Sequence, residues 1–158
     1  MRLTFKQKLL SFLDSYDVYD GNGNIYFRVK SKLDFGHNFI IYNSHNEEVG
    51  RLKQKILCLF PEYTIYKGYD KLGVIKKEIT FLKPKFHISF GGYTVQGNFL
   101  EWDYDVYKYG RKIASLSKQL FNLTDTYMID VEENEALIVL MIVLAIDSIK
   151  DNRSQHGS

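Results

Sequence analysis

The pattern of apolar and polar positions changes character once along this chain, close to its C-terminal end. Residues 136–146 form an unbroken apolar run that follows Glu132, Glu133 and Glu135. Its length, its acidic start and its Ala, Leu and Met content favour a helix over about residues 134–149, because carboxylates suit a helix N-terminus. A buried strand is the alternative, since Ile and Val are frequent in the run. The run is shorter than the about 20 residues that cross a bilayer, so a helix apolar on every side has to be enclosed by the rest of the chain.

The remainder of the chain alternates apolar and polar residues and repeats itself. Copies of one pattern occupy residues 5–11, 29–33, 52–58, 75–79, 93–95 and 116–120. A period of about 23 residues suits two strands with their turns and is too short for a strand–helix–strand unit. Turn residues such as the Gly-Asn-Gly-Asn of 21–24 separate the alternating runs. Six two-stranded units predict a mainly β fold, a closed antiparallel barrel of about twelve strands around the C-terminal helix.

Small residues on the apolar strand faces fit this arrangement. Gly50 and Gly73 hold equivalent places in two copies, and a position without a side chain is what the close approach of a central helix requires. The alternation changes phase near Ile56, where a bulge or turn is expected. It then continues with Leu57 and Leu59, which this pattern assigns to the apolar face.

Length and composition indicate one domain, and charge bears on its partners. The 158 residues are expected to form a single barrel domain over residues 1–150 with a disordered polar tail at 151–158. The 21 basic and 19 acidic residues give a net charge of +2, which argues against nucleic acid as the default partner. Cys58 is the single cysteine, so an intrachain disulfide is excluded and a reducing compartment is favoured. The N-terminal residues contain no secretory apolar segment.

A set of short motifs, spread along almost the whole chain, carries a family resemblance. They are Phe5-Lys6-Gln7-Lys8, Asp20-Gly21, Val49-Gly50-Arg51-Leu52, Thr124-Asp125-Thr126-Tyr127 and Ala145-Ile146-Asp147. The sequence resembles the LURP-one-related family, within the tubby C-terminal-like group that also includes phospholipid scramblases. The resemblance implies a twelve-stranded barrel around a central hydrophobic helix. It also implies a link to membranes, because tubby-type members bind phosphoinositide head groups through basic residues. The compact LURP-one-related members mostly lack an assigned activity, and the palmitoylated cysteine-rich segment of scramblases is absent here.

Motifs for catalysis and metal binding are weak. The histidines and Cys58 lack the spacing of metal ligands, and neither a metal nor a cofactor is expected. Asp103 and Asp105 share one strand face with Glu101 nearby, and this pair gives the alternative of a small-molecule-binding or enzymatic barrel with a mouth pocket. A solvated strand face is the simpler interpretation. Asp147 closes the apolar run, where it either marks the emergence of the helix, which we favour, or is buried and paired.

The basic residues at repeat-equivalent positions give the leading functional hypothesis. The candidate anion-binding residues are Lys53, Lys55, Lys76, Lys77, Lys83, Lys85, Arg111 and Lys112. Gathered on one barrel face, they would attract anionic lipid head groups; scattered, they would be ordinary solvated surface. The sequence thus predicts a non-enzymatic interaction or adaptor domain, cytoplasmic and peripheral at a membrane, whose partner is an anionic phospholipid or a protein. A nucleic-acid-associated regulator is a third hypothesis.

Overall fold

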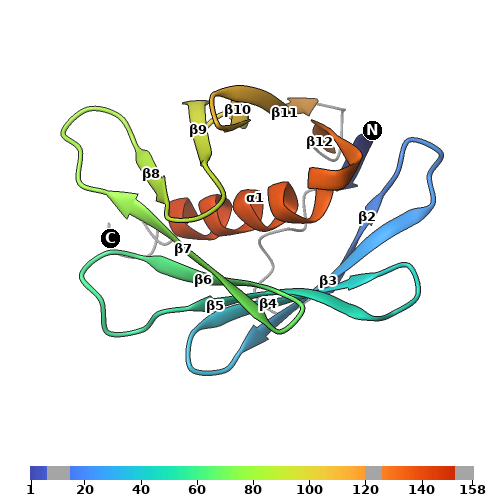
Figure 1. Ribbon diagram of the computed structural model, residues 1–158, viewed down its shortest axis with the longest axis horizontal. Helices are drawn as coiled ribbons and strands as arrows, with labels where there is room; N and C mark the ends of the chain where they lie inside the picture. The colour runs from blue at the N-terminus through green and yellow to red at the C-terminus, as the bar shows by residue number, and fades with distance from the viewer. Residues whose placement is uncertain (7–14, 120–125, 152–158) are drawn as a thin grey trace.

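A mainly β barrel around one helix is the architecture of this protein. The computed structural model describes residues 1–6, 15–119 and 126–151. In these ranges twelve antiparallel strands form one sheet that curls around α1 (Ala136–Asp151), and the short 3-10 helix η2 (Glu133–Glu135) leads into α1 (Figure 1). The predicted fold class is confirmed. The expected tail at 151–158 lies outside the described residues apart from Asp151.

The strands follow one another around the barrel in chain order. They are β1 (Arg2–Lys6), β2 (Tyr16–Tyr19), β3 (Ile25–Leu33), β4 (His37–Asn43), β5 (Glu48–Gln54), β6 (Glu62–Lys67), β7 (Asp70–Glu78), β8 (Lys85–Ile88), β9 (Tyr93–Asn98), β10 (Asp103–Lys108), β11 (Arg111–Gln119) and β12 (Thr126–Val131). Each strand pairs with the next except at β8 and β9, which are the two edges of the sheet, and β1 also pairs with β12. The rings of Phe86 and Phe99, 5.0 Å apart between centroids, bring the two edge regions into contact. The barrel is therefore nearly closed, with aromatic packing in place of a strand ladder at one seam.

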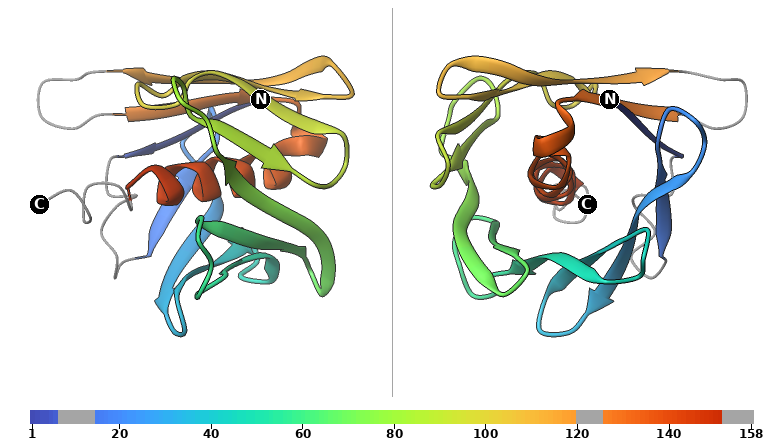
Figure 2. Two further views of the ribbon diagram at one scale, coloured as in Figure 1. Left: turned by 90° about the vertical axis from the view of Figure 1, so that its left-hand side faces the viewer. Right: turned by 45° about the vertical axis from the view of Figure 1, so that its right-hand side comes forward.

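The sequence repeat appears in the structure as a recurring irregularity in strand pairing. The register shifts directly before a tyrosine in four hairpins, at Val18/Tyr19, Ile41/Tyr42, Ile65/Tyr66 and Val106/Tyr107. A β-bulge bends its strand and increases the local twist. Bulges at equivalent places therefore help to curl the sheet around the helix, as the end-on view in Figure 2 shows.

The core consists of α1 and the inward side chains of the strands. Residues 139–143 of α1 have no solvent exposure at all. A Cβ at Gly50 would lie 2.9 Å from Met141 Sδ and 3.2 Å from Leu137 Cδ1 on α1, so the predicted close approach of the helix is confirmed at this position. At Gly73 the same reasoning is wrong, because a Cβ there would meet Ser89 and Phe90, which follow β8, and not α1.

The turn predicted near Ile56 is confirmed, since β5 ends at Gln54. The assignment of Leu57 and Leu59 to the apolar face is wrong: both are fully exposed, at 102% and 95%. The alternation argument fails here because it assumes a strand, and this segment is a loop that leads away from the barrel wall. Leu57 has a left-handed backbone (φ 62°), which no strand residue adopts.

Where α1 begins, a buried carboxylate is held by two partners from the strands. Glu135 accepts a hydrogen bond from Tyr93 Oη at 2.5 Å and one from Lys108 Nζ at 2.6 Å. Burial opposes ionisation of this carboxyl, but these hydrogen bonds outweigh it, and the pKa of Glu135 lies below its ordinary value. Burial, and then the hydrogen bond to Glu135, raise the pKa of Tyr93 to about 12, so the phenol keeps its proton and donates it.

At the opposite end of α1 a second charged pair is buried. Asp147 Oδ1 lies 3.1 Å from Lys150 Nζ, and the two side chains are only 5% and 12% exposed. The Lys150 ammonium also donates to the Phe99 carbonyl at 3.1 Å and lies 4.5 Å from the centre of the Trp102 ring. The preference for emergence of the helix at Asp147 is therefore wrong. The barrel encloses α1 as far as Ile149, which is 1% exposed, and Phe99 and Trp102 help to cover it.

The enclosure of α1 predicts a severe effect of a charge at its centre. Replacing Leu140, which has no exposure, with aspartate would place an unpaired carboxylate inside the barrel. We expect Leu140→Asp to lose about 4 kcal/mol or more, comparable with the whole stability of a domain, and to accumulate in the insoluble fraction. The matched control is Leu82→Asp, since Leu82 is 96% exposed and the variant should melt like the wild type. Circular dichroism melting and soluble yield measure both; a soluble, cooperatively melting Leu140→Asp would contradict the enclosure.

The contacts of Glu135 predict a pH dependence of stability. A carboxyl with a lowered pKa in the folded state stabilises the protein above its unfolded-state pKa, and this contribution is lost as the pH falls through the folded-state value. We expect Glu135→Gln to be less stable at neutral pH and to lose less of its unfolding free energy on acidification than the wild type. The exposed neighbour Glu133 gives the control, Glu133→Gln. Urea unfolding at a series of pH values checks this, and parallel curves for wild type and Glu135→Gln would refute it.

Candidate functional site

Three hairpin loops extend from the barrel end at which α1 finishes. They connect β3 to β4, β5 to β6 and β7 to β8. Ser148, near the end of α1, lies 2.6 Å from Tyr63 Oη and 3.3 Å from His37 Nδ1, and these residues stand beside the first two loops. In Figure 1 the β5–β6 and β7–β8 loops reach out on the same side of the barrel as the last turn of α1.

These loops carry most of the exposed large apolar side chains among the described residues. The set, called the apolar rim below, consists of Leu33, Phe35, Ile56, Leu57, Leu59, Phe60, Ile79, Phe81 and Leu82. Phe81 is 102% exposed and Phe35 is 86% exposed, so these rings are almost wholly in water. Single exposed apolar side chains are ordinary in folded domains, whereas a set of this size on the loops of one end is typical of surfaces that contact a partner or a membrane.

The structure brings six of the eight predicted basic residues to this end of the barrel. Lys53 and Lys55 lie where β5 passes into its loop, Lys76 and Lys77 near the end of β7, and Lys83 and Lys85 at the start of β8. The strand ends and loops at 31–39, 52–63 and 76–88 contain seven lysines, with Asp34, Glu62 and Glu78 as their carboxylates. The rim is therefore both apolar and positively charged.

The other two predicted residues lie at the opposite end. Arg111 and Lys112 begin β11, where Arg111 pairs with Glu132 and the Lys112 ammonium lies 3.5 Å from Asp105 Oδ2. The segments 20–24, 44–48 and 132–135 at that end contain six carboxylates and no lysine or arginine. The turns 67–71 and 108–112 at the same end add one carboxylate and five basic residues. The loop segments of the rim thus hold seven lysines against three carboxylates, and the segments of the other end hold seven carboxylates against five basic residues. Six of the eight candidate anion-binding residues therefore lie at the more basic end.

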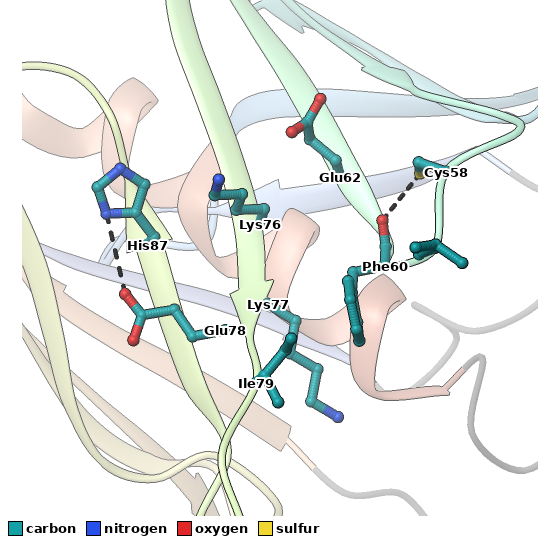
Figure 3. Close-up of a pocket in the computed structure, with 9 residues that line it drawn as sticks. Cys58, Phe60, Glu62, Lys76, Lys77, Glu78, Ile79 and His87 are labelled. Atoms are coloured by element: carbon teal, nitrogen blue, oxygen red, sulfur yellow. Dashed lines mark hydrogen bonds and ion pairs between the residues drawn. The ribbon is translucent and has the colours of Figure 1, made fainter.

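A groove on the outer surface of the rim combines apolar and charged groups. It has a volume of about 560 Å³ and is lined by Cys58, Leu59, Phe60, Glu62, Lys76, Lys77, Glu78, Ile79 and His87. Figure 3 shows Lys76 between Glu62 and His87, with His87 Nδ1 3.9 Å from Glu78 Oε1. Lys55 Nζ lies 3.5 Å from Glu62 Oε2. The groove thus places two lysines and two carboxylates beside apolar side chains.

A second, smaller cavity lies next to the β3–β4 loop. Its volume is about 250 Å³ and it is lined by Lys32, Asp34, Phe35, Asn38, Ile40, Arg51, Lys53 and Gln54. The Lys53 ammonium also lies 5.6 Å from the centre of the Tyr66 ring.

Of the candidate carboxylates Asp103 and Asp105, the structure gives Asp105 partners on the outer surface of the barrel. Asp105 accepts a hydrogen bond from Ser115 Oγ at 2.6 Å in addition to its contact with Lys112. Asp103 is exposed, while Tyr104 between them is buried. Neither of the two cavities is lined by Asp103 or Asp105.

The sequence contained a signal for the rim that reasoning by alternation missed. Leu57-Cys58-Leu59-Phe60 and Phe81-Leu82 each place apolar residues next to one another beside a proline or lysine. Adjacent apolar residues next to turn residues fit neither a half-buried strand nor a polar loop. Within the described ranges, no helix combines the length and apolarity that crossing a bilayer requires.

Comparison with known proteins agrees with this architecture. The family model described as LURP-one-related matches residues 1–147. The uncharacterised protein YxjI of Bacillus subtilis (strain 168) is 27% identical over 154 residues, which cover 96% of this chain and 95% of that protein. An X-ray structure of an Arabidopsis thaliana protein superposes with a TM-score of 0.63 at 16% identity, over 94% of this chain and 91% of that one, and so shares the fold. By the match over nearly its whole length, this chain belongs to the LURP-one-related family.

Proposed function

We propose that this protein is a non-enzymatic interaction domain that associates with anionic membrane lipid through the lysines of the rim. The observation that carries the proposal is the gathering of Lys53, Lys55, Lys76, Lys83 and Lys85 at one end of the barrel, while at the other end carboxylates outnumber basic residues. A polarised charge distribution orients a protein on a charged surface, which evenly scattered charge does not. The tubby-like resemblance of the sequence points in the same direction.

The arrangement favours a membrane surface as the partner over nucleic acid and over a small molecule bound inside the barrel. The barrel interior is occupied by α1, so a ligand has to be met at the loops or on the outer wall. The apolar side chains between the lysines suit a lipid surface and have no role in binding a phosphate backbone, which is recognised through charge and hydrogen bonds. The protein would then work peripherally, with its acidic end turned away from the membrane.

Neutralising the rim lysines is expected to weaken lipid association selectively. Each basic residue near an anionic bilayer contributes about 1 kcal/mol, so Lys76→Gln/Lys83→Gln/Lys85→Gln should lower partitioning by about a hundredfold at low salt. Lys76 lies on β7, Lys83 in the β7–β8 loop and Lys85 on β8. All three side chains are exposed, so the substitutions should leave the stability of the fold unchanged. Co-sedimentation with vesicles of phosphatidylcholine, with and without phosphatidylserine, measures the effect.

The matched control removes equal charge from the opposite end. Lys67→Gln/Lys71→Gln/Lys112→Gln changes three exposed lysines there and should bind the acidic vesicles almost like the wild type. Rising salt should weaken wild-type binding, because screening shortens the reach of surface charge. Equal partitioning of the wild type onto neutral and acidic vesicles would contradict the proposal, and so would equal losses in the two triple variants.

A further inference from the structure

The lysines account for attraction to an anionic surface, but not for the apolar side chains that project between them. We propose, resting on the lipid association above, that the apolar rim inserts among the lipid acyl chains, so that the barrel stands on the bilayer with the C-terminal end of α1 facing it. The ligand is an anionic bilayer, in which a layer of phosphate groups covers an apolar interior.

Each of the three loops is held by its own hydrogen bonds. In the β5–β6 loop, the Cys58 thiol has two carbonyl acceptors for its one proton, that of Phe60 at 2.8 Å from Sγ (Figure 3) and that of Lys55 at 3.2 Å. In the β7–β8 loop the Thr80 hydroxyl donates to the Lys83 carbonyl.

The β3–β4 loop is closed in the same manner. The Asp34 amide donates to the Gly36 carbonyl at 3.1 Å, and Asn38 Nδ2 donates to the Asp34 carbonyl at 2.6 Å. These polar contacts satisfy loop backbone groups locally, and the large apolar side chains are left on the outside. The loops are therefore preorganised with their apolar groups exposed, which reduces the ordering cost of binding.

Apolar and basic groups are arranged in the order of the layers of a bilayer. Leu57, Leu59, Phe81 and Leu82 occupy the loops themselves and are between 95% and 102% exposed. Lys53, Lys76 and Lys85 lie on the strands or at their ends, behind those tips. When the tips enter the apolar interior, these lysines reach the height of the phosphates, where long basic side chains bind while their stems stay in apolar surroundings.

The polarity of the barrel sets the orientation. At the far end the carboxylates of 20–24, 44–48 and 132–135 outnumber the basic residues of the turns 67–71 and 108–112, so an anionic surface attracts that end less than the lysine-bearing loops. Tyr69 and Tyr109, the exposed aromatic residues of the β6–β7 and β10–β11 turns, also lie there and stay in water.

An environment-sensitive fluorophore tests insertion directly. In a Cys58→Ser background, Leu59→Cys places the label on the rim, and Tyr69→Cys places it at the opposite end, both at fully exposed positions. With phosphatidylserine-containing vesicles, the emission of the nitrobenzoxadiazole label should shift to the blue and increase severalfold at position 59 and stay unchanged at 69. Co-sedimentation without a shift at position 59 would overturn insertion and leave lipid association standing, whereas absence of co-sedimentation would overturn both.

A rim variant provides the second measurement. Leu57→Ser/Leu59→Ser/Phe81→Ser/Leu82→Ser removes exposed apolar groups, so its melting temperature should match the wild type while vesicle binding falls at least tenfold. The loss should persist at high salt, unlike that of the lysine variant, because apolar transfer is not screened. Unchanged vesicle binding, or a wild-type dimer that this variant converts to a monomer without loss of lipid binding, would assign the rim to a protein contact and overturn the proposal.

Discussion

The enclosure of one wholly apolar helix is the constraint on which the rest of this structure depends. A helix such as α1 has no side that water can solvate, so its stability comes entirely from the wall built around it. The wall in turn needs the helix, because a barrel of twelve strands is too wide to fill with its own side chains. The glycine at position 50, which Met141 and Leu137 overlie, shows how closely the two are fitted.

Enclosure also decides what happens at the two ends of the helix. The barrel shields the carboxylates of Glu135 and Asp147 from water. Glu135 pairs with Lys108, and Asp147 pairs with Lys150. An unpaired charge there would be costly, since its desolvation would not be compensated. The Glu135–Lys108 pair and the hydrogen bond from Lys150 to the Phe99 carbonyl connect the two ends of the helical segment to the barrel wall, and the Asp147–Lys150 pair lies within α1 itself.

A filled interior moves the functional surface to the outside, where the two ends of the barrel differ. The β3–β4, β5–β6 and β7–β8 loops at one end carry leucines and phenylalanines, whereas the turns at the other end carry glycines, carboxylates and a smaller number of basic residues. The stability of the fold does not require the exposed leucines and phenylalanines, because they bury almost nothing. Membership in the LURP-one-related family establishes the scaffold. Because a fold does not imply a function, the features to test for activity are the side chains that differ between the two ends of the barrel.

Local and periodic features were determined by the sequence itself. Twelve strands, the enclosed helix after Glu135 and the turn near Ile56 follow from alternation, repeats and an apolar run, because these depend on neighbours along the chain. Only the tertiary structure decided the rest: that Asp147 is buried and pairs with Lys150, which contacts Phe99 and Trp102, that Leu57 and Leu59 point into water, and that six lysines share an end which Arg111 and Lys112 do not. Those facts depend on strand register and on the end at which each hairpin loop falls, and residues brought together in this way are far apart in the sequence.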